Sequence, residues 1–177
     1  MKQTQVWYVI IAAFIILIGV WFFMHNSAPK VILDTSMGNI EIQLDQRANI
    51  TTGNFLSLVN SGFYNGVTFH RVIQGFMIQA GDQSGTGAGG SGKEIPDEFV
   101  PEDSNVRGAI AMANRGPNTG TSQFFINQVD NKNLDGNYPV FGNVVSGMDV
   151  VDRIAAVKVN ANNKPLQNVT IIRAYQK

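Results

Sequence analysis

The sequence contains no cysteine, and this absence removes several classes of protein at once. Without cysteine there is no disulfide framework, no thiol nucleophile and no cysteine-based metal site. Histidine is also scarce: only His25 and His70 are present, so a zinc site would have few possible ligands. We therefore expect neither a metal site nor a cofactor.

The sequence has no excess of either charge, because thirteen basic and thirteen acidic residues cancel. Nucleic-acid-binding domains normally carry a basic excess or patch, so no nucleic-acid partner is expected. The acidic pairs at residues 97–98 and 102–103 stand in a proline-flanked segment and are interpreted as solvated surface charge. No acid–base dyad stands out among them.

Two further catalytic patterns are incomplete. No serine lies in a G-x-S-x-G context, so His70 is interpreted as a packed or hydrogen-bonded structural residue. Residues 87–93 match the phosphate-loop pattern GxxxxGK, but Glu94 stands where a Mg²⁺-binding hydroxyl belongs and Pro96 blocks the following helix. We expect no nucleotide partner and interpret the glycine-rich segment 81–92 as a surface loop bordering a site.

The longest apolar run lies near the N-terminus, where residues 6–24 contain no charge and no proline. Nineteen such residues can cross a bilayer as a helix. Aromatic residues stand at both ends of the run, as is typical of the two membrane interfaces. The run predicts a transmembrane anchor behind a tail of residues 1–5. A cleaved signal peptide is the alternative.

The rest of the chain is predicted to be one domain, residues 31–177, joined by a linker of residues 25–30. Lys2 and the short N-terminal tail favour an N-terminus on the inner side of the membrane. This predicts a single-pass protein of the inner or cell membrane with its domain on the periplasmic or extracytoplasmic side. If the segment is cleaved, a soluble periplasmic protein is expected instead.

The domain reads as mainly β. Residues 31–35 and 40–44 predict a hairpin, and residues 169–175 predict a closing strand. Thr52 predicts the start of one helix, and residues 150–155 predict a second. Few helices and many short strands indicate an antiparallel sheet folded into a barrel or a sandwich.

One stretch, residues 69–82, sets Arg71 and Gln79 among large apolar side chains. Alternation within it predicts two short strands joined through Gln74 and Gly75. A surface arginine whose stem covers apolar neighbours is the alternative to a functional one.

Several segments together resemble the cyclophilin-type peptidyl-prolyl cis-trans isomerases. In order along the chain they are Phe-His-Arg-Val-Ile-x-Gly-Phe-Met-x-Gln-x-Gly-Asp, Met-Ala-Asn, Thr-Ser-Gln-Phe-Phe-Ile, Leu-Asp-Gly and Val-Phe-Gly. The similarity extends over residues 31–175. It implies a closed eight-stranded antiparallel β-barrel capped by two α-helices, and an enzyme that rotates X-Pro peptide bonds.

The resemblance also implies a set of site residues. Catalysis falls to Arg71 and Gln79, and substrate binding to Phe76, Met77, Ala113, Asn114, Gln123, Phe125, Leu134 and Tyr138. Four of these side chains would form the walls of a proline pocket: Phe76, Met77, Phe125 and Leu134. The main chain of Asn114 would pair with the bound peptide.

Three positions depart from the eukaryotic pattern of the family. Asn133 replaces a tryptophan that contacts cyclosporin, Tyr138 replaces a histidine, and Gln74 replaces a proline. We therefore expect weak cyclosporin binding and a bacterial-type, membrane-anchored member that binds proline-containing polypeptides and assists the folding of exported proteins. A noncatalytic peptide-binding module on the same fold is the alternative.

Overall fold

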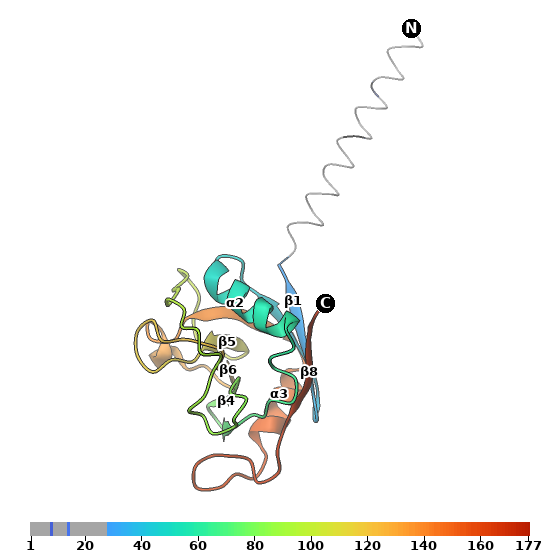
Figure 1. Cartoon of the computed structure of the whole chain (residues 1–177), viewed down its shortest axis with the longest axis vertical. Helices are drawn as coiled ribbons and strands as arrows, with labels where there is room; N and C mark the ends of the chain where they lie inside the picture. The colour runs from blue at the N-terminus through green and yellow to red at the C-terminus, as the bar shows by residue number, and fades with distance from the viewer. Residues whose placement is uncertain (1–7, 9–13, 15–27) are drawn as a thin grey trace.

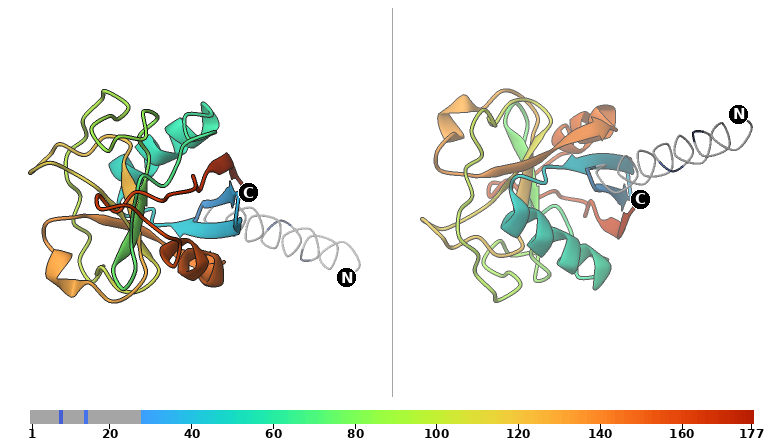
Figure 2. Two further views of the ribbon diagram at one scale, coloured as in Figure 1. Left: turned by 90° about the horizontal axis from the view of Figure 1, so that it is seen from below. Right: turned by 90° about the horizontal axis from the view of Figure 1, so that it is seen from above.

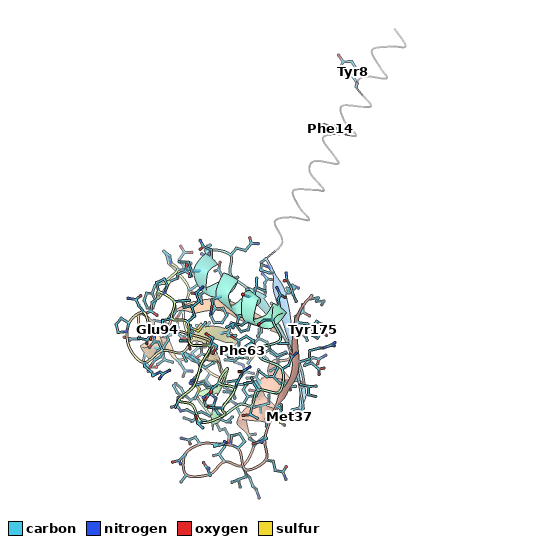
Figure 3. The ribbon with its side chains drawn as sticks, in the orientation of Figure 1. Tyr8, Phe14, Met37, Phe63, Glu94 and Tyr175 are labelled. Carbon is cyan, nitrogen blue, oxygen red and sulfur yellow. The ribbon has the colours of Figure 1, made fainter. Side chains whose placement is uncertain are left out.

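The computed structural model describes Tyr8, Phe14 and residues 28–177. Within this part of the chain, no helix is both long enough and apolar enough to cross a membrane. The predicted anchor, residues 6–24, lies outside the described residues apart from Tyr8 and Phe14, whose side chains are exposed (Figure 3). The anchor therefore stays a prediction.

The domain is built on one eight-stranded antiparallel sheet, with strand order β3-β4-β6-β5-β7-β2-β1-β8. Figure 1 shows β4, β6 and β5 side by side, and β1 beside β8. The strands are β1 (Lys30–Thr35), β2 (Gly38–Leu44), β3 (Arg71–Ile73), β4 (Met77–Ala80), β5 (Ala109–Met112), β6 (Phe124–Asn127), β7 (Val140–Ser146) and β8 (Ile171–Gln176). The predicted hairpin is β1 and β2, and the predicted closing strand is β8, which pairs with β1. The mainly β prediction is confirmed.

The sheet is not closed along its two end strands, so the prediction of a closed barrel is wrong in this respect. No ladder joins β3 to β8; the segments that precede them meet at a single bridge between Thr68 and Thr170. The reason lies at β3, which is only three residues long. The N–H of its central residue, Val72, donates to the carbonyl of Asn163 in a loop at 2.8 Å. The loop that contains Asn163 thus covers the edge of β3 that does not face β4.

In the described part of the chain, two α-helices lie at opposite ends of the curved sheet (Figure 2), and both bury residues in the same core. They are α2 (Asn49–Asn60) and α3 (Met148–Ala155), and a short 3₁₀ helix, η1 (Lys132–Leu134), precedes β7. The second predicted helix is confirmed by α3, whose buried face holds Val150, Val151, Ile154 and Ala155. Apolar residues at this spacing share one face of a helix.

The helix α2 begins three residues before the predicted N-cap, Thr52. Glu98 supplies the cap from a distant loop: its carboxylate accepts the N–H groups of Ile50 at 3.1 Å and Thr51 at 2.6 Å. The first N–H groups of a helix lack partners within it, and a carboxylate satisfies them well. The interpretation of Glu98 as solvated charge is therefore wrong, because it has a fixed partner in the fold.

The main core is enclosed by the sheet and both helices, and an aromatic group lies at its α2 side. The ring of Phe55 on α2 lies 5.1 Å from Tyr64, 5.5 Å from Phe124 and 5.2 Å from Phe141, measured between centroids. Phe63, labelled in Figure 3, packs against Tyr64 at 5.4 Å. Tilted and edge-on arrangements at these distances are the favourable ones for aromatic rings.

A second, smaller apolar cluster lies apart from this core. It consists of Met77, Ala109, Ala111, Phe125 and Val140. Alternate residues of the same strands, such as Ile110 and Phe124, belong to the main core. Because successive side chains of a strand point to opposite faces, β5 and β6 each serve both clusters.

Replacing Gly53 by alanine is expected to stabilise the domain by about 0.5–1 kcal/mol, since glycine costs that much inside a helix. Gly53 is exposed within α2, and a Cβ there meets no atom within 4 Å. Urea unfolding of the two proteins measures the difference. A lower free energy of unfolding for Gly53→Ala would contradict the open surroundings of this position.

Candidate active site

The hairpin of β3 and β4 sets Arg71 directly opposite Gln79. Gly75 in the connecting turn has φ 74°, a conformation that glycine adopts without strain. Across the hairpin, Nη1 of Arg71 donates to Oε1 of Gln79 at 3.2 Å. The prediction of two short strands joined through Gln74 and Gly75 is confirmed.

The Gln79 side chain is held from its other end by Gln123. Its Nε2 donates to Oε1 of Gln123 at 2.9 Å, and Gln123 is buried just before β6. The Arg71 side chain is exposed and forms no ion pair with any described carboxylate. The Gln79 amide therefore orients the Arg71 guanidinium, and no described carboxylate neutralises its charge.

Beside this charge lies a pocket of about 210 Å³. Its walls are Arg71, Phe76, Met77, Gln79, Ala113, Asn114, Phe125, Leu134 and Tyr138. These are nine of the ten site residues predicted from the sequence. The tenth, Gln123, lies behind Gln79.

Two members of the smaller apolar cluster, Met77 and Phe125, form the floor of this pocket. Met77 and Phe125 are both almost fully buried, at 1% and 4% exposed. The Phe125 ring meets Tyr138 edge-on, with centroids 5.6 Å apart. The Arg71 guanidinium carbon stands 6.0 Å from the centroid of Phe76, at the limit of a cation–π contact. The pocket thus joins an apolar floor to a cationic rim.

Ala113 and Asn114 form the rim that continues beyond the pocket. The Asn114 side chain donates to the carbonyl of Asn137 at 2.8 Å, and the Ala113 N–H donates to the carbonyl of Gln123 at 2.9 Å. A smaller hollow of about 80 Å³ adjoins them. Gly87 lines it, as expected for a segment interpreted as a loop bordering a site. The set of site residues predicted from the sequence omitted Gly87, Arg115, Thr119 and Thr121. Arg115, Thr119 and Thr121 lie close to Asn114 or Gln123 in the sequence, and this closeness was the available signal for them.

The comparison with protein families decides the identity of this fold. The model of the "Cyclophilin type peptidyl-prolyl cis-trans isomerase/CLD" family matches residues 30–176. The chain belongs to the cyclophilin family. As a cyclophilin, it is a peptidyl-prolyl cis-trans isomerase.

Known cyclophilins agree in both sequence and structure. The peptidyl-prolyl cis-trans isomerase-like 1 of Aspergillus fumigatus is 45% identical over 152 residues, which cover 83% of this chain and 94% of that protein. A crystal structure of a cyclophilin-type isomerase of Cryptosporidium parvum has a TM-score of 0.82 and 33% identity, covering 85% of this chain and 98% of the other. A second structure of that isomerase, determined in the presence of the dipeptide Ala-Pro, has a TM-score of 0.79 and 34% identity, with coverage of 82% and 96%. These relatives are eukaryotic, so they lend no support to a bacterial type.

His70 is packed inside this cyclophilin and lies outside the pocket walls. It is 6% exposed, and neither ring nitrogen has a hydrogen-bond partner among the described residues. Burial lowers the pKa of His70 from its ordinary 6.5, although the charge of Asp82 opposes the shift. The neutral ring is therefore the form that this site accommodates.

Two of the positions that depart from the eukaryotic pattern differ in their relation to the cyclophilin pocket. Tyr138 is one of its walls, whereas Asn133 is exposed on η1 and does not line it. Weak cyclosporin binding stays a prediction. No group of three or more acidic or histidine side chains is placed to hold a metal ion in the described part of the chain.

Proposed function

We propose that this cyclophilin rotates X-Pro bonds in exported proteins, with Arg71 as the group that lowers the barrier. One observation carries the proposal: an arginine that pairs with no described carboxylate stands at the rim of a pocket floored by Met77 and Phe125. The pocket offers an apolar surface to a proline ring. The guanidinium offers donors to the peptide bond beside it.

The chemistry requires neither a nucleophile nor a proton donor. A planar X-Pro amide must twist through a state in which its nitrogen loses conjugation, over a barrier of about 18–20 kcal/mol. In the twisted state the nitrogen lone pair is localised, so it accepts a hydrogen bond from Arg71 far better than the planar amide does. Such a bond stabilises the transition state more than the ground state, which is what accelerates a reaction.

The remaining catalysis comes from holding the ring while the preceding carbonyl rotates. Phe76, Met77, Phe125 and Leu134 surround the space for the ring, and Gln79 keeps the guanidinium beside it. The structure of the Cryptosporidium isomerase determined in the presence of Ala-Pro supports a proline-containing ligand for the same fold. We extend this to proline-containing polypeptides in general, held along the rim by Asn114.

The proposed setting is the outer side of a membrane. The apolar run of residues 6–24 supports an anchor, with the domain on the periplasmic or extracytoplasmic side. There the enzyme would meet chains as they emerge unfolded, when uncatalysed isomerisation takes roughly 10–100 s. A cleaved signal and a soluble periplasmic protein form the second version of this proposal.

The activity is tested by following cis-to-trans exchange of a short X-Pro peptide with the purified full chain. Rapid exchange is expected, and a peptide with alanine in place of proline serves as the control for nonspecific effects. A folded chain that binds the peptide without speeding its exchange would instead assign the groove to the noncatalytic alternative.

The membrane setting needs a separate test. Carbonate extraction of membranes, followed by the intact mass of the recovered chain, distinguishes the two versions of the proposal. Retention in the membrane with a near-full-length mass supports the anchor. Release into the soluble fraction with loss of the first 20–30 residues supports a cleaved signal.

The rate of isomerisation is expected to be nearly constant from about pH 6 to 9. A guanidinium is a permanent cation at working pH, so the donors that the mechanism uses do not change over this range. Burial lowers the pKa of His70, and its ring does not line the pocket, so the titration of this histidine should not govern the rate. Exchange rates of the X-Pro peptide at several pH values check this. A bell-shaped profile that follows a histidine would contradict the mechanism.

A further inference from the structure

Asp82 is a buried carboxylate that the proposed mechanism does not use. Its side chain is 1% exposed and forms no ion pair with any described cation. It accepts backbone N–H groups of the loop that follows it: Ser84 at 2.8 Å, Thr86 at 3.1 Å, Gly87 at 2.7 Å and Gly89 at 3.2 Å. The hydroxyls of Ser84 and Thr86 also donate to it.

These bonds keep Asp82 ionised although it is buried. Burial alone would raise its pKa, but the hydrogen bonds from Ser84, Gly89 and Gly87 outweigh this effect and hold the pKa well below its usual range. The carboxylate is therefore a permanent acceptor, and the N–H groups that converge on it fix the path of the loop from residue 83 to residue 89.

The same loop turns two carbonyls toward the active site. Nε2 of Gln123 donates to the carbonyl of Gly87 at 2.9 Å and to that of Gly89 at 2.7 Å. The N–H groups of these two glycines are the ones bound to Asp82. Each glycine thus donates its N–H to Asp82 and accepts a hydrogen bond from Gln123 at its carbonyl.

These two carbonyls determine which group donates and which accepts in the hydrogen bonds from Gln123 to Gln79 and from Gln79 to Arg71. A carbonyl only accepts, so Gln123 must turn its NH₂ group to the loop and its oxygen to Gln79. Gln79 must then turn its NH₂ group to Gln123 and its oxygen to Arg71, as the contacts of 2.9 and 3.2 Å have it. If Gln79 were reversed, its NH₂ group would face a guanidinium, which has only donors.

We propose that Asp82 is a positioning residue of the isomerase: it fixes the carbonyls of Gly87 and Gly89, which orient Gln123 and Gln79 so that an acceptor faces Arg71. The inference rests on the proposed role of Arg71 in catalysis. Asp82 itself lines neither the pocket nor the adjoining hollow. Its effect reaches Arg71 through the two glycines, then Gln123, then Gln79. In each of these hydrogen bonds the donor and the acceptor are fixed.

The space around Asp82 agrees with a fixed loop. A Cβ at Gly89 would lie 2.2 Å from Oδ1 of Asp82 and 3.1 Å from Oγ of Ser84. Real Cβ atoms do not approach an oxygen so closely, so Gly89→Ala must displace the loop or the carboxylate. The displacement would move the carbonyl that Gln123 uses without changing any charge.

The direct test is Asp82→Asn in the full chain, because asparagine keeps the size of the side chain but adds an NH₂ group among donors. We expect kcat for an X-Pro peptide to fall about ten- to a hundredfold, the usual cost of a misplaced catalytic group. The Kd of the peptide should stay close to that of the unchanged chain, since the apolar walls are intact. Exchange NMR at saturating peptide gives kcat, and a titration gives Kd.

Glu98→Gln is the matched control. Glu98 also accepts two backbone N–H groups, at the start of α2, but it has no hydrogen bond to Gln123, Gln79 or Arg71. Its replacement should lower stability and leave kcat unchanged. A fall in kcat in both variants would mean that any lost carboxylate slows the enzyme, and it would overturn the proposal.

A double-mutant cycle separates positioning from a merely structural role. Gln123→Met removes the amide that the loop carbonyls orient, so adding Asp82→Asn to it should cost little further activity. Residues that act through one another give such non-additive effects, whereas independent ones add. Full additivity would overturn the proposal.

If Asp82→Asn does not fold, Gly89→Ala replaces it in the same measurements, with Gly53→Ala as the matched glycine control. A folded Asp82→Asn or Gly89→Ala protein with unchanged kcat sinks the inference. If Arg71→Ala is inactive at the same time, the proposed function stands and only the role of Asp82 fails. If Arg71→Ala keeps full activity, the catalytic mechanism fails first.

Discussion

Replacing Arg71 by alanine is expected to lower kcat for X-Pro isomerisation by about a hundred- to a thousandfold, the usual cost of removing a donor that stabilises a transition state. The guanidinium is the group that can meet the developing lone pair, and it is exposed, so its removal leaves no cavity in the core. Peptide affinity should change much less, because the apolar walls of the pocket remain. Exchange NMR and a binding titration measure the two quantities separately.

The control for this prediction is Arg153→Ala. Arg153 is another exposed arginine, paired with Asp149 on α3, and it does not line the pocket. Its loss should leave kcat unchanged. Arg71→Lys is informative as well, since lysine keeps the charge but loses the planar set of donors. Full turnover by Arg71→Ala would refute the proposed mechanism.

Replacing Phe55 by alanine is expected to cost about 3–5 kcal/mol of folding free energy, as for other buried aromatic residues. The ring has no exposed surface and contacts three other rings from its place on α2. Without it a cavity opens between the helix and the sheet. Since small domains are stable by about 5–15 kcal/mol, much of the total would be lost. Urea unfolding followed by circular dichroism gives the value.

Phe99→Ala serves as the matched control, because Phe99 is 49% exposed. It should change the free energy of unfolding by no more than about 0.5 kcal/mol, as surface substitutions do. Similar losses for the two phenylalanines would show that the aromatic cluster around Phe55 is not the main source of stability.

Local patterns in the sequence predicted the local parts of the fold. The hairpin of β1 and β2, the hairpin that carries Arg71 and Gln79, and the helix α3 all follow from alternation or helical spacing within a few residues. The start of α2 did not, because Glu98 caps it from a loop 47 residues away from Thr51. The loop that covers the edge of β3 was missed for the same reason, since Asn163 lies far along the chain from Val72.

The site could be predicted further than the fold because it was inferred from several motifs in register. The structure gathers all ten of the predicted residues around one pocket and its adjoining hollow, although their individual roles stay predictions. The bonds around Asp82 were not foreseen. A glycine-rich segment has no periodicity to interpret, and its order comes from one carboxylate that collects N–H groups which the sequence does not mark as partners.

The separation of the two apolar clusters has a consequence for how this enzyme can evolve. Met77 and Phe125 floor the groove, while alternate residues such as Ile78 and Phe124 build the main core. Changes in the groove therefore act on a different set of contacts from those that determine most of the stability, and effects at separate sites largely add. Substitutions in the groove can therefore change the peptide preference without unfolding the domain. Related isomerases with different substrate proteins can evolve from one such domain.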